Sequence, residues 1–267
     1  RAFPGETREA RMEIARKLET TRLKLVPFFE GIEAANPALV REQISALWSF
    51  TITSGAELAM DRVSQRVPLP FDLLVNAKTQ KVELTPSDAD TALEKEAKAQ
   101  LSELPGFGVS MNFVFELTVA VDPATATPEN VKVYKLGEAT PREIAVAEVR
   151  VLPHTGAMSC AASGAPADCV HVLVKPADKE LPLAPGASYA VVVRRGLRAR
   201  GGGAVRPMPI GHFLRSPYPL FENGESRVSA LTAENAEKLE RVRLMVDPLL
   251  AKIGRDDVVS AWSFTTL

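Results

Sequence analysis

The chain contains 267 residues, and its 32 Lys and Arg against 33 Asp and Glu give a formal net charge of −1. A near-neutral charge disfavours binding of nucleic acid or another polyanion through bulk charge. Hydrophobic residues make up 46% of the chain and charged residues 24%, which fits a folded globular protein rather than a disordered or membrane protein. No apolar run approaches the roughly 20 residues of a spanning helix. We therefore expect neither a nucleic-acid partner nor a membrane span.

The first predicted element is an amphipathic helix. Its apolar residues Leu18, Leu25, Phe28 and Ile32 recur at helical spacing. Pro27 predicts the start of a second short helix, because proline is well accommodated in a first helical turn. A strand is expected near residues 47–53. The next helix is predicted from about 91 to 104.

Most of the remaining chain is predicted to be strand. Residues 109–121 alternate apolar and polar side chains, which is typical of one half-buried strand. A second amphipathic helix precedes the last strand, and Pro248 predicts a restart within it, as Pro27 does above. Turn signals separate the segments, so the sequence predicts a mostly β fold, an antiparallel β-sandwich with helical insertions. The shorter strands are expected at 131–136, 144–152, 170–174, 189–197 and 261–266.

The chain contains an internal repeat. A shift of 221 positions aligns residues 15–23 with 236–244, and the match continues through Pro27 with Pro248. After a loop that is seven residues longer in the first copy, Trp-Ser-Phe-Thr occurs again at 48–51 and 262–265. Self-similarity marks tandem modules. We therefore predict that residues 1–54 are the tail of a preceding module, a helix plus its last strand. Residues 55–267 are then a complete module, with a helical insertion at about 207–254.

The order of several segments resembles a known family. The segments are Leu69-Pro-Phe-Asp-Leu-Leu74, Gly106-Phe107, the run 117–127 with Asp122-Pro-Ala-Thr125, Asn130-Val-Lys-Val-Tyr134, Tyr189-Ala-Val-Val-Val193 with Gly196-Leu197, and Arg255 to Thr266. Together they resemble the N-terminal Ig-like domain of bacterial virulence-factor (extracellular) lipases and, more loosely, bacterial surface Ig-like modules. The resemblance covers about 55–267. It implies an Ig-like β-sandwich located outside the cell, at the bacterial surface or in the periplasm.

These observations give three hypotheses about function. The first is a non-catalytic Ig-like module of a secreted or cell-surface bacterial protein, acting as a spacer, scaffold or adhesion unit. Its partners would be neighbouring modules of the same protein, and also a surface glycan or protein ligand. The alternative is an accessory N-terminal domain of a secreted lipase or esterase whose hydrolase domain lies downstream. A third is a carbohydrate-binding module. A serine hydrolase would need Gly-x-Ser-x-Gly, which this sequence lacks, so we expect no catalytic residue here.

Two pairs of residues are candidate structural elements. Cys160 and Cys169 lie nine positions apart among small residues, which favours a disulfide across the neck of a loop. Free thiols, or a zinc site with the nearby histidines, remain alternatives. The two tryptophans would be candidate sugar-binding residues if they were exposed. Because each recurs at the same place in a repeated apolar strand, we predict that they anchor the core instead. The predicted anchors are Trp48, Phe50, Trp262 and Phe264.

Charged clusters give weaker candidates. Arg194, Arg195, Arg198 and Arg200 form a candidate anion patch, with a solvated strand end and turn as the simpler interpretation. The acidic pairs Asp88/Asp90 and Asp256/Asp257 are candidate calcium ligands, although neither follows an EF-hand pattern. No cofactor is expected, with calcium as the one candidate cation.

Overall fold

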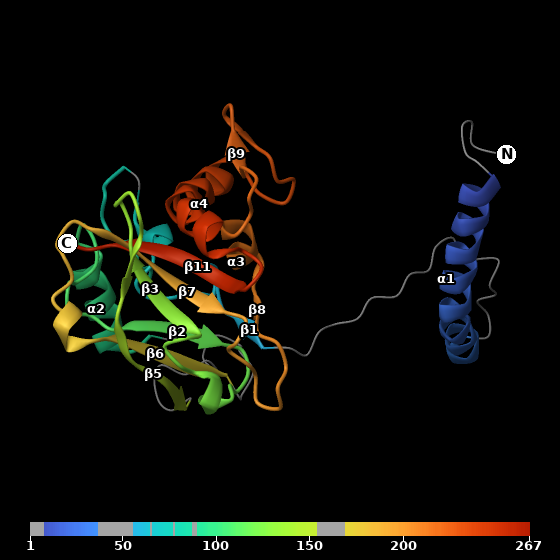
Figure 1. Ribbon diagram of the computed structural model, residues 1–267, viewed down its shortest axis with the longest axis horizontal. Coiled ribbons are helices and arrows are strands. Elements are labelled where there is room, and N and C mark those ends of the chain that lie inside the picture. Colours follow the sequence, from blue (N-terminus) through green and yellow to red (C-terminus); the bar gives the residue numbers. More distant parts are fainter. Residues whose placement is uncertain (1–7, 37–55, 65, 77, 87–89, 154–168) are drawn as a thin grey trace. The chain divides into compact units, whose positions relative to one another are not determined.

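A computed structural model describes residues 8–36, 56–64, 66–76, 78–86, 90–153 and 169–267 of the chain. The chain divides into two units, Arg1–Ser54 and Gly55–Leu267. In the first unit, the described residues form the helix α1 (Arg8–Ala35) (Figure 1). The second unit contains two large β-sheets together with helices and a short hairpin.

The two sheets form the body of the second unit. Hydrogen-bonded neighbours run in the order β5-β6-β2-β1-β8 in the first sheet and β11-β7-β3-β4 in the second. Every pair is antiparallel except the short parallel pair of β1 and β8. The strands are β1 (Glu57–Leu58), β2 (Phe113–Leu117), β3 (Val131–Lys135), β4 (Arg142–Ile144), β5 (Val146–Pro153), β6 (Val170–Pro176), β7 (Ser188–Arg194), β8 (Arg206–Pro207) and β11 (Val258–Thr265).

The two sheets face each other across the main hydrophobic core. Phe113 and Phe115 of β2 contact Phe264 and Trp262 of β11, with ring centroids 4.9 Å and 5.8 Å apart. Tyr189 of β7 stacks on Phe264 at 5.4 Å. All five rings are buried. Because these rings come from opposing sheets, the second unit is a two-sheet sandwich, which confirms the predicted mostly β fold with helices. Its Ig-like character stays a prediction.

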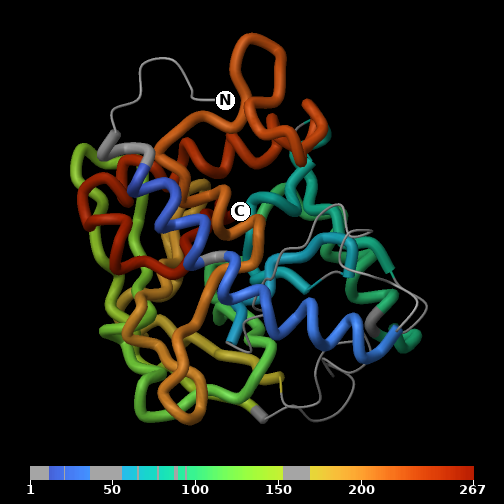
Figure 2. The backbone as a smooth tube through the Cα atoms, turned by 90° about the vertical axis from the view of Figure 1, so that its right-hand side faces the viewer, coloured from blue at the N-terminus to red at the C-terminus, as the bar shows by residue number. Residues whose placement is uncertain are grey.

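Helix α4 (Ala233–Ile253) forms a third layer on the outer face of the second sheet (Figures 1 and 2). Val246, Leu249 and Leu250 of this helix share a buried cluster with Ala190 of β7 and Ala261 of β11. The smaller elements are α2 (Ala92–Leu101), α3 (Pro209–Leu214), β9 (Phe221–Glu222) and β10 (Glu225–Ser226), together with the 3-10 turns η2 (Asp72–Leu74), η3 (Pro123–Thr125) and η5 (Asp178–Glu180). The hairpin of β9 and β10 lies on the same side of the unit as α4, and β5 and β6 lie on the opposite side.

Three details of the predicted fold are wrong. Residues 109–121 do not form one strand: after Leu117 the chain stops pairing with β6, and Val121 pairs with Ala199 instead, so the ladder breaks at the change of partner. Pro27 and Pro248 do not start new helices but lie inside α1 and α4. A helix can continue past a proline at the cost of one backbone hydrogen bond. Finally, the parallel pair of β1 and β8 departs from a wholly antiparallel arrangement.

The start of the second unit is tied to its last strand. Trp262 donates its indole N–H to the carbonyl of Pro70 at 3.0 Å. Ser263 donates its hydroxyl to Asp72 Oδ2 at 2.7 Å, and Asp72 opens η2. Burial raises the pKa of the Asp72 carboxyl above its ordinary value, although hydroxyl hydrogen bonds from Ser263 and Thr265 act to lower it.

Asp72 makes the folded protein less stable as pH rises above the ordinary carboxyl pKa. Its raised pKa means that the folded state holds a proton that the unfolded chain releases, so stability falls as pH rises from the ordinary carboxyl pKa, about 4, through the folded one. We expect Asp72→Asn to flatten this decline, measured as the urea unfolding free energy at pH 4 to 7.

A second aspartate provides the control for this measurement. Burial acts to raise the pKa of Asp61, but hydrogen bonds from Ser64 and Val63 outweigh it and hold the pKa below its ordinary value. Asp61→Asn should therefore remove a stabilising contribution that the wild-type protein loses on acidification. Its effect on the pH profile of stability is opposite in sign to that of Asp72→Asn. Parallel pH profiles of wild type and Asp72→Asn would contradict the prediction.

Candidate interaction surface

One face of α4 packs against the sandwich. Its apolar residues recur every three or four positions and so lie on one side of the helix. Leu239 and Val242 join the main core, while Val246, Leu249 and Leu250 cover the second sheet. Thr232 caps the helix by accepting a hydrogen bond from the Asn235 N–H at 3.3 Å. Through this face, α4 covers the outer side of the second sheet.

The same side of α4 carries a buried ion pair. Arg243 donates to both carboxylate oxygens of Glu240, from Nε at 2.8 Å and from Nη2 at 2.7 Å. The side chains are only 6% and 10% exposed. Glu240 Oε2 also accepts the backbone N–H of Leu220 at 2.9 Å, and Arg243 Nη1 donates to the carbonyl of Ser216 at 3.3 Å. The pair therefore fixes the segment between α3 and β9 to the helix.

Further charges extend this network. Asp247 Oδ1 accepts from Arg243 at 3.1 Å and from Arg255 at 2.6 Å. Burial acts to raise the pKa of Glu240, but the hydrogen bonds from Arg243 and Leu220 outweigh it and hold the pKa below its ordinary value. Arg243 has a raised pKa, chiefly because of its hydrogen bond to Glu240. Both groups stay ionised across the neutral range.

The repeat places the same residues on α1. Residues 12–32 align without a gap on residues 233–253, and nine of the 21 positions are identical. The identities include charged residues as well as apolar ones. Lys17 pairs with Glu13 at 2.7 Å in α1, as Lys238 pairs with Glu234 at 2.7 Å in α4.

The ion pair of α4 also recurs in α1. Arg22 donates to Glu19 from Nε and Nη2, both at 2.7 Å, which is the same two-point geometry as between Arg243 and Glu240. Here the side chains are 58% and 53% exposed. The pair thus forms within each helix, and in α4 it also holds a second segment.

Exposure separates the two helices at two apolar positions of the face. Leu18 is 65% exposed, whereas Leu239 at the equivalent position of α4 is 4% exposed. Phe28 is 52% exposed, and its equivalent Leu249 is 1% exposed. A position off the face behaves identically in both helices: Leu23 is 56% exposed and Leu244 55%. The largest differences therefore lie on the side that α4 packs on the sheet, where Leu25 and Phe29 of α1 are half-buried. We call this side of α1, which also carries Glu19 and Arg22, the α1 face.

The structure places the other predicted residues as follows. Trp262 and Phe264 are fully buried, whereas Trp48 and Phe50 lie outside the described residues. Cys169 is buried next to β6, but Cys160 also lies outside the described residues, so the disulfide stays a prediction.

The four arginines of the candidate anion patch follow one another from the end of β7 into the next turn. Arg194 Nε lies 3.5 Å from an Asp257 carboxylate oxygen. The other three, Arg195, Arg198 and Arg200, are exposed. Because the one half-buried guanidinium already faces a carboxylate, the arrangement fits the simpler interpretation of a solvated strand end. Anion binding by the four arginines stays a prediction.

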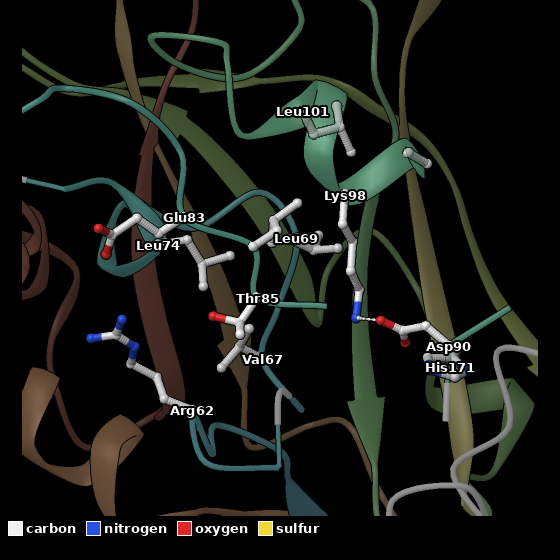
Figure 3. Close-up of a pocket in the computed structure, with 12 residues that line it drawn as sticks. Arg62, Val67, Leu69, Leu74, Glu83, Thr85, Asp90, Lys98, Leu101 and His171 are labelled. Carbon is white, nitrogen blue, oxygen red and sulfur yellow. Dashed lines mark hydrogen bonds and ion pairs between the residues drawn. The ribbon is translucent and has the colours of Figure 1, made fainter. Parts of the chain in front are cut away.

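The described part of the chain also contains a groove of about 540 Å³. Figure 3 shows Leu69, Leu74 and Leu101 lining it, together with the ion pair of Lys98 and Asp90 at 2.7 Å. His171 lines this groove, is mostly buried and has Nε2 3.9 Å from Glu116 Oε2. Glu116 in turn accepts from Arg66. Of the charged groups that line the groove, Lys98 and Asp90 are therefore paired with each other.

Neither a metal centre nor a membrane span is found in the described residues. No group of three or more His, Cys, Asp or Glu side chains there is placed to hold a metal ion. No described helix is long and apolar enough to cross a membrane. Asp88, one of the calcium candidates, lies outside the described residues.

The residues of this surface that the sequence did not single out are Glu19, Arg22, Glu240 and Arg243. They fall within the repeated segments, where Leu-Glu-x-x-Arg recurs at 18–22 and 239–243. The signal was that polar residues are identical in the two copies of the helix. Identical apolar residues indicate packing alone, whereas an acid and a base repeated three positions apart indicate that both helices form the same ion pair.

Comparison with known proteins gives two weak structural matches. No protein-family model matches the chain, and no curated protein matches it. Among solved structures, the N-terminal part of the bacterial S-layer protein SbsC aligns at 19% identity over 43% of this chain and 27% of its own. The S-layer protein rSbsC(31-844) aligns at 21% identity over 43% of this chain and 16% of its own. The TM-score is 0.26 in both cases, so neither likeness carries an argument about fold or function.

Proposed function

We propose that residues 55–267 are one module of a tandem array in a secreted or cell-surface protein, with a structural role as spacer or scaffold, and that residues 1–54 are the end of the module before it. One observation carries the proposal. The side of α4 that closes the sandwich recurs in α1, with its polar pair intact, but on α1 the apolar residues Leu18 and Phe28 are exposed.

The energetic argument favours a partner for this face. Burying a large aliphatic or aromatic side chain stabilises a protein by roughly 1.5 to 3 kcal/mol relative to leaving it in water. Exposed apolar residues gathered on one side of a helix therefore mark an interaction surface. The location of the protein at the surface rests on the family resemblance of residues 55–267.

Cysteine labelling of the full-length natural protein on intact cells tests both parts of the proposal. We expect Leu23→Cys to react with a membrane-impermeant maleimide, because this position is exposed in both helices of the repeat. Leu18→Cys and Phe28→Cys should be protected there but react in the isolated 267-residue chain. The labelled peptide is identified by mass, so Cys160 and Cys169 do not interfere.

Two outcomes would contradict the proposal. Equal reaction of positions 18, 23 and 28 on cells would show that the α1 face has no partner in the natural protein. Reaction of position 23 only after cell lysis would exclude the surface location.

A further inference from the structure

We infer that the α1 face binds the outer face of a four-stranded sheet in the preceding module, and that Glu19 and Arg22 capture a backbone segment of that module. The inference rests on the proposed function and adds the identity of the partner surface. The partner must offer small apolar side chains and, beside them, one free backbone N–H and one free carbonyl. The second unit shows this arrangement around its own helix α4.

The apolar part of the partner is defined by the α4 cluster. On the sheet side, Ala190, Val192 and Ala261 receive Val246, Leu249 and Leu250. The equivalents of these three on α1 are Leu25, Phe28 and Phe29, which are as large or larger. A sheet that accepts α1 therefore needs side chains no larger than those of β7 and β11.

The polar part of the partner is defined by the contacts of Glu240 and Arg243. Glu240 accepts the Leu220 N–H, and Arg243 donates to the Ser216 carbonyl. The two backbone groups that the pair binds therefore lie four residues apart in the chain. In α1 the same two-point pair is already formed and solvated. Because the pair is pre-formed, capture of a loop costs little side-chain ordering, and it fixes the helix in one register on the sheet.

This inference distinguishes the partner from other occupants of an amphipathic helix. A lipid surface presents no fixed N–H and carbonyl to a carboxylate and guanidinium three positions apart. A second copy of this chain offers the outer face of its second sheet only if its own α4 leaves that face. The geometry therefore points to the preceding module, whose other strands come before α1 in the chain and whose predicted last strand follows it.

A helix graft in the full chain tests whether α1 is fitted to such a surface. Residues 233–253 are replaced by residues 12–32, which have the same length and keep Glu and Arg at positions 240 and 243. The graft is made in a Trp48→Phe background, so that fluorescence reports Trp262 alone. We expect a cooperative urea transition with the emission of a buried tryptophan, at a midpoint below that of the parent.

A register control makes the result specific. Grafting residues 13–33 instead rotates the face by about 100° and moves the pair by one position. We expect this chain to lose the cooperative transition. In the correct graft, Glu240→Gln should lower the midpoint further, whereas Glu19→Gln in α1 of the parent chain should leave it unchanged.

Overpacking is controlled separately, since the graft puts phenylalanine where α4 has Leu249 and Leu250. A second graft carries leucine at these two positions. If neither graft folds, or if both registers fold equally well, the inference is wrong even when labelling on cells shows the α1 face to be buried. Protection of position 18 in the isolated chain that rises with protein concentration would identify a second copy as the partner and would also overturn it.

Discussion

Replacing Trp262 by alanine is expected to lower the unfolding free energy of the second unit by about 3 to 5 kcal/mol. The side chain is fully buried, meets Phe115 across the core in an edge-on contact and donates its indole N–H to Pro70. The substitution removes the largest side chain of the inner layer and leaves the Pro70 carbonyl without this donor. Urea denaturation followed by far-ultraviolet circular dichroism measures the loss.

Tyr218 is the control for this substitution. It is an aromatic residue of the same unit, and its side chain is mostly exposed. Tyr218→Ala should shift the urea midpoint by no more than the scatter between preparations. A Trp262 variant as stable as the Tyr218 variant would show that the two sheets do not depend on the contact between β2 and β11.

Replacing Arg243 by alanine is expected to cost about 3 to 5 kcal/mol, since it leaves the buried Glu240 carboxylate without its counter-charge. The matched variant is Arg22→Ala, which breaks the same two-point pair at the equivalent position of α1. There both side chains face water, and we expect no measurable change in stability. The two variants thus compare one pair in two environments within a single chain.

The double substitution Glu240→Leu with Arg243→Met refines this measurement. Removing both charges avoids the buried unpaired carboxylate, so the chain should recover part of the stability lost in Arg243→Ala. The backbone N–H of Leu220 and the carbonyl of Ser216 lose their partners, which limits the recovery. If Arg243→Ala and Arg22→Ala are equally mild, the pair does not hold the segment between α3 and β9.

The sequence predicts the layers of this fold better than its boundaries. Short candidate segments separated by turn signals located β3, β6, β7 and β11, which form regular ladders with their neighbours. Alternation of apolar and polar side chains was the signal for the longest predicted strand. It failed at residues 109–121, where the pattern of side chains continues although the chain changes partner after Leu117. Periodicity reports which face is buried and contains no information about which strand lies alongside.

The interaction surface was only half visible in the sequence. The repeat located α1 and α4, and helical spacing identified Leu18, Phe28, Leu239 and Leu249 as one face. What the sequence could not give is the contact of Glu240 and Arg243 with backbone atoms of Leu220 and Ser216. Backbone groups look alike in every sequence, so a side chain that binds them leaves no matching residue type to search for.

The contacts that join Pro70 and Asp72 to the last strand have a consequence for synthesis. They link residues 192 and 191 positions apart, so the sandwich cannot close until nearly the whole unit has left the ribosome. At typical translation rates of about 5 to 20 residues per second, this delay amounts to roughly 10 to 40 s. Until β11 emerges, Phe113 and Phe115 of β2 lack their aromatic partners Phe264 and Trp262. We therefore expect chaperones, or an export route that carries the chain unfolded, to protect this surface during synthesis.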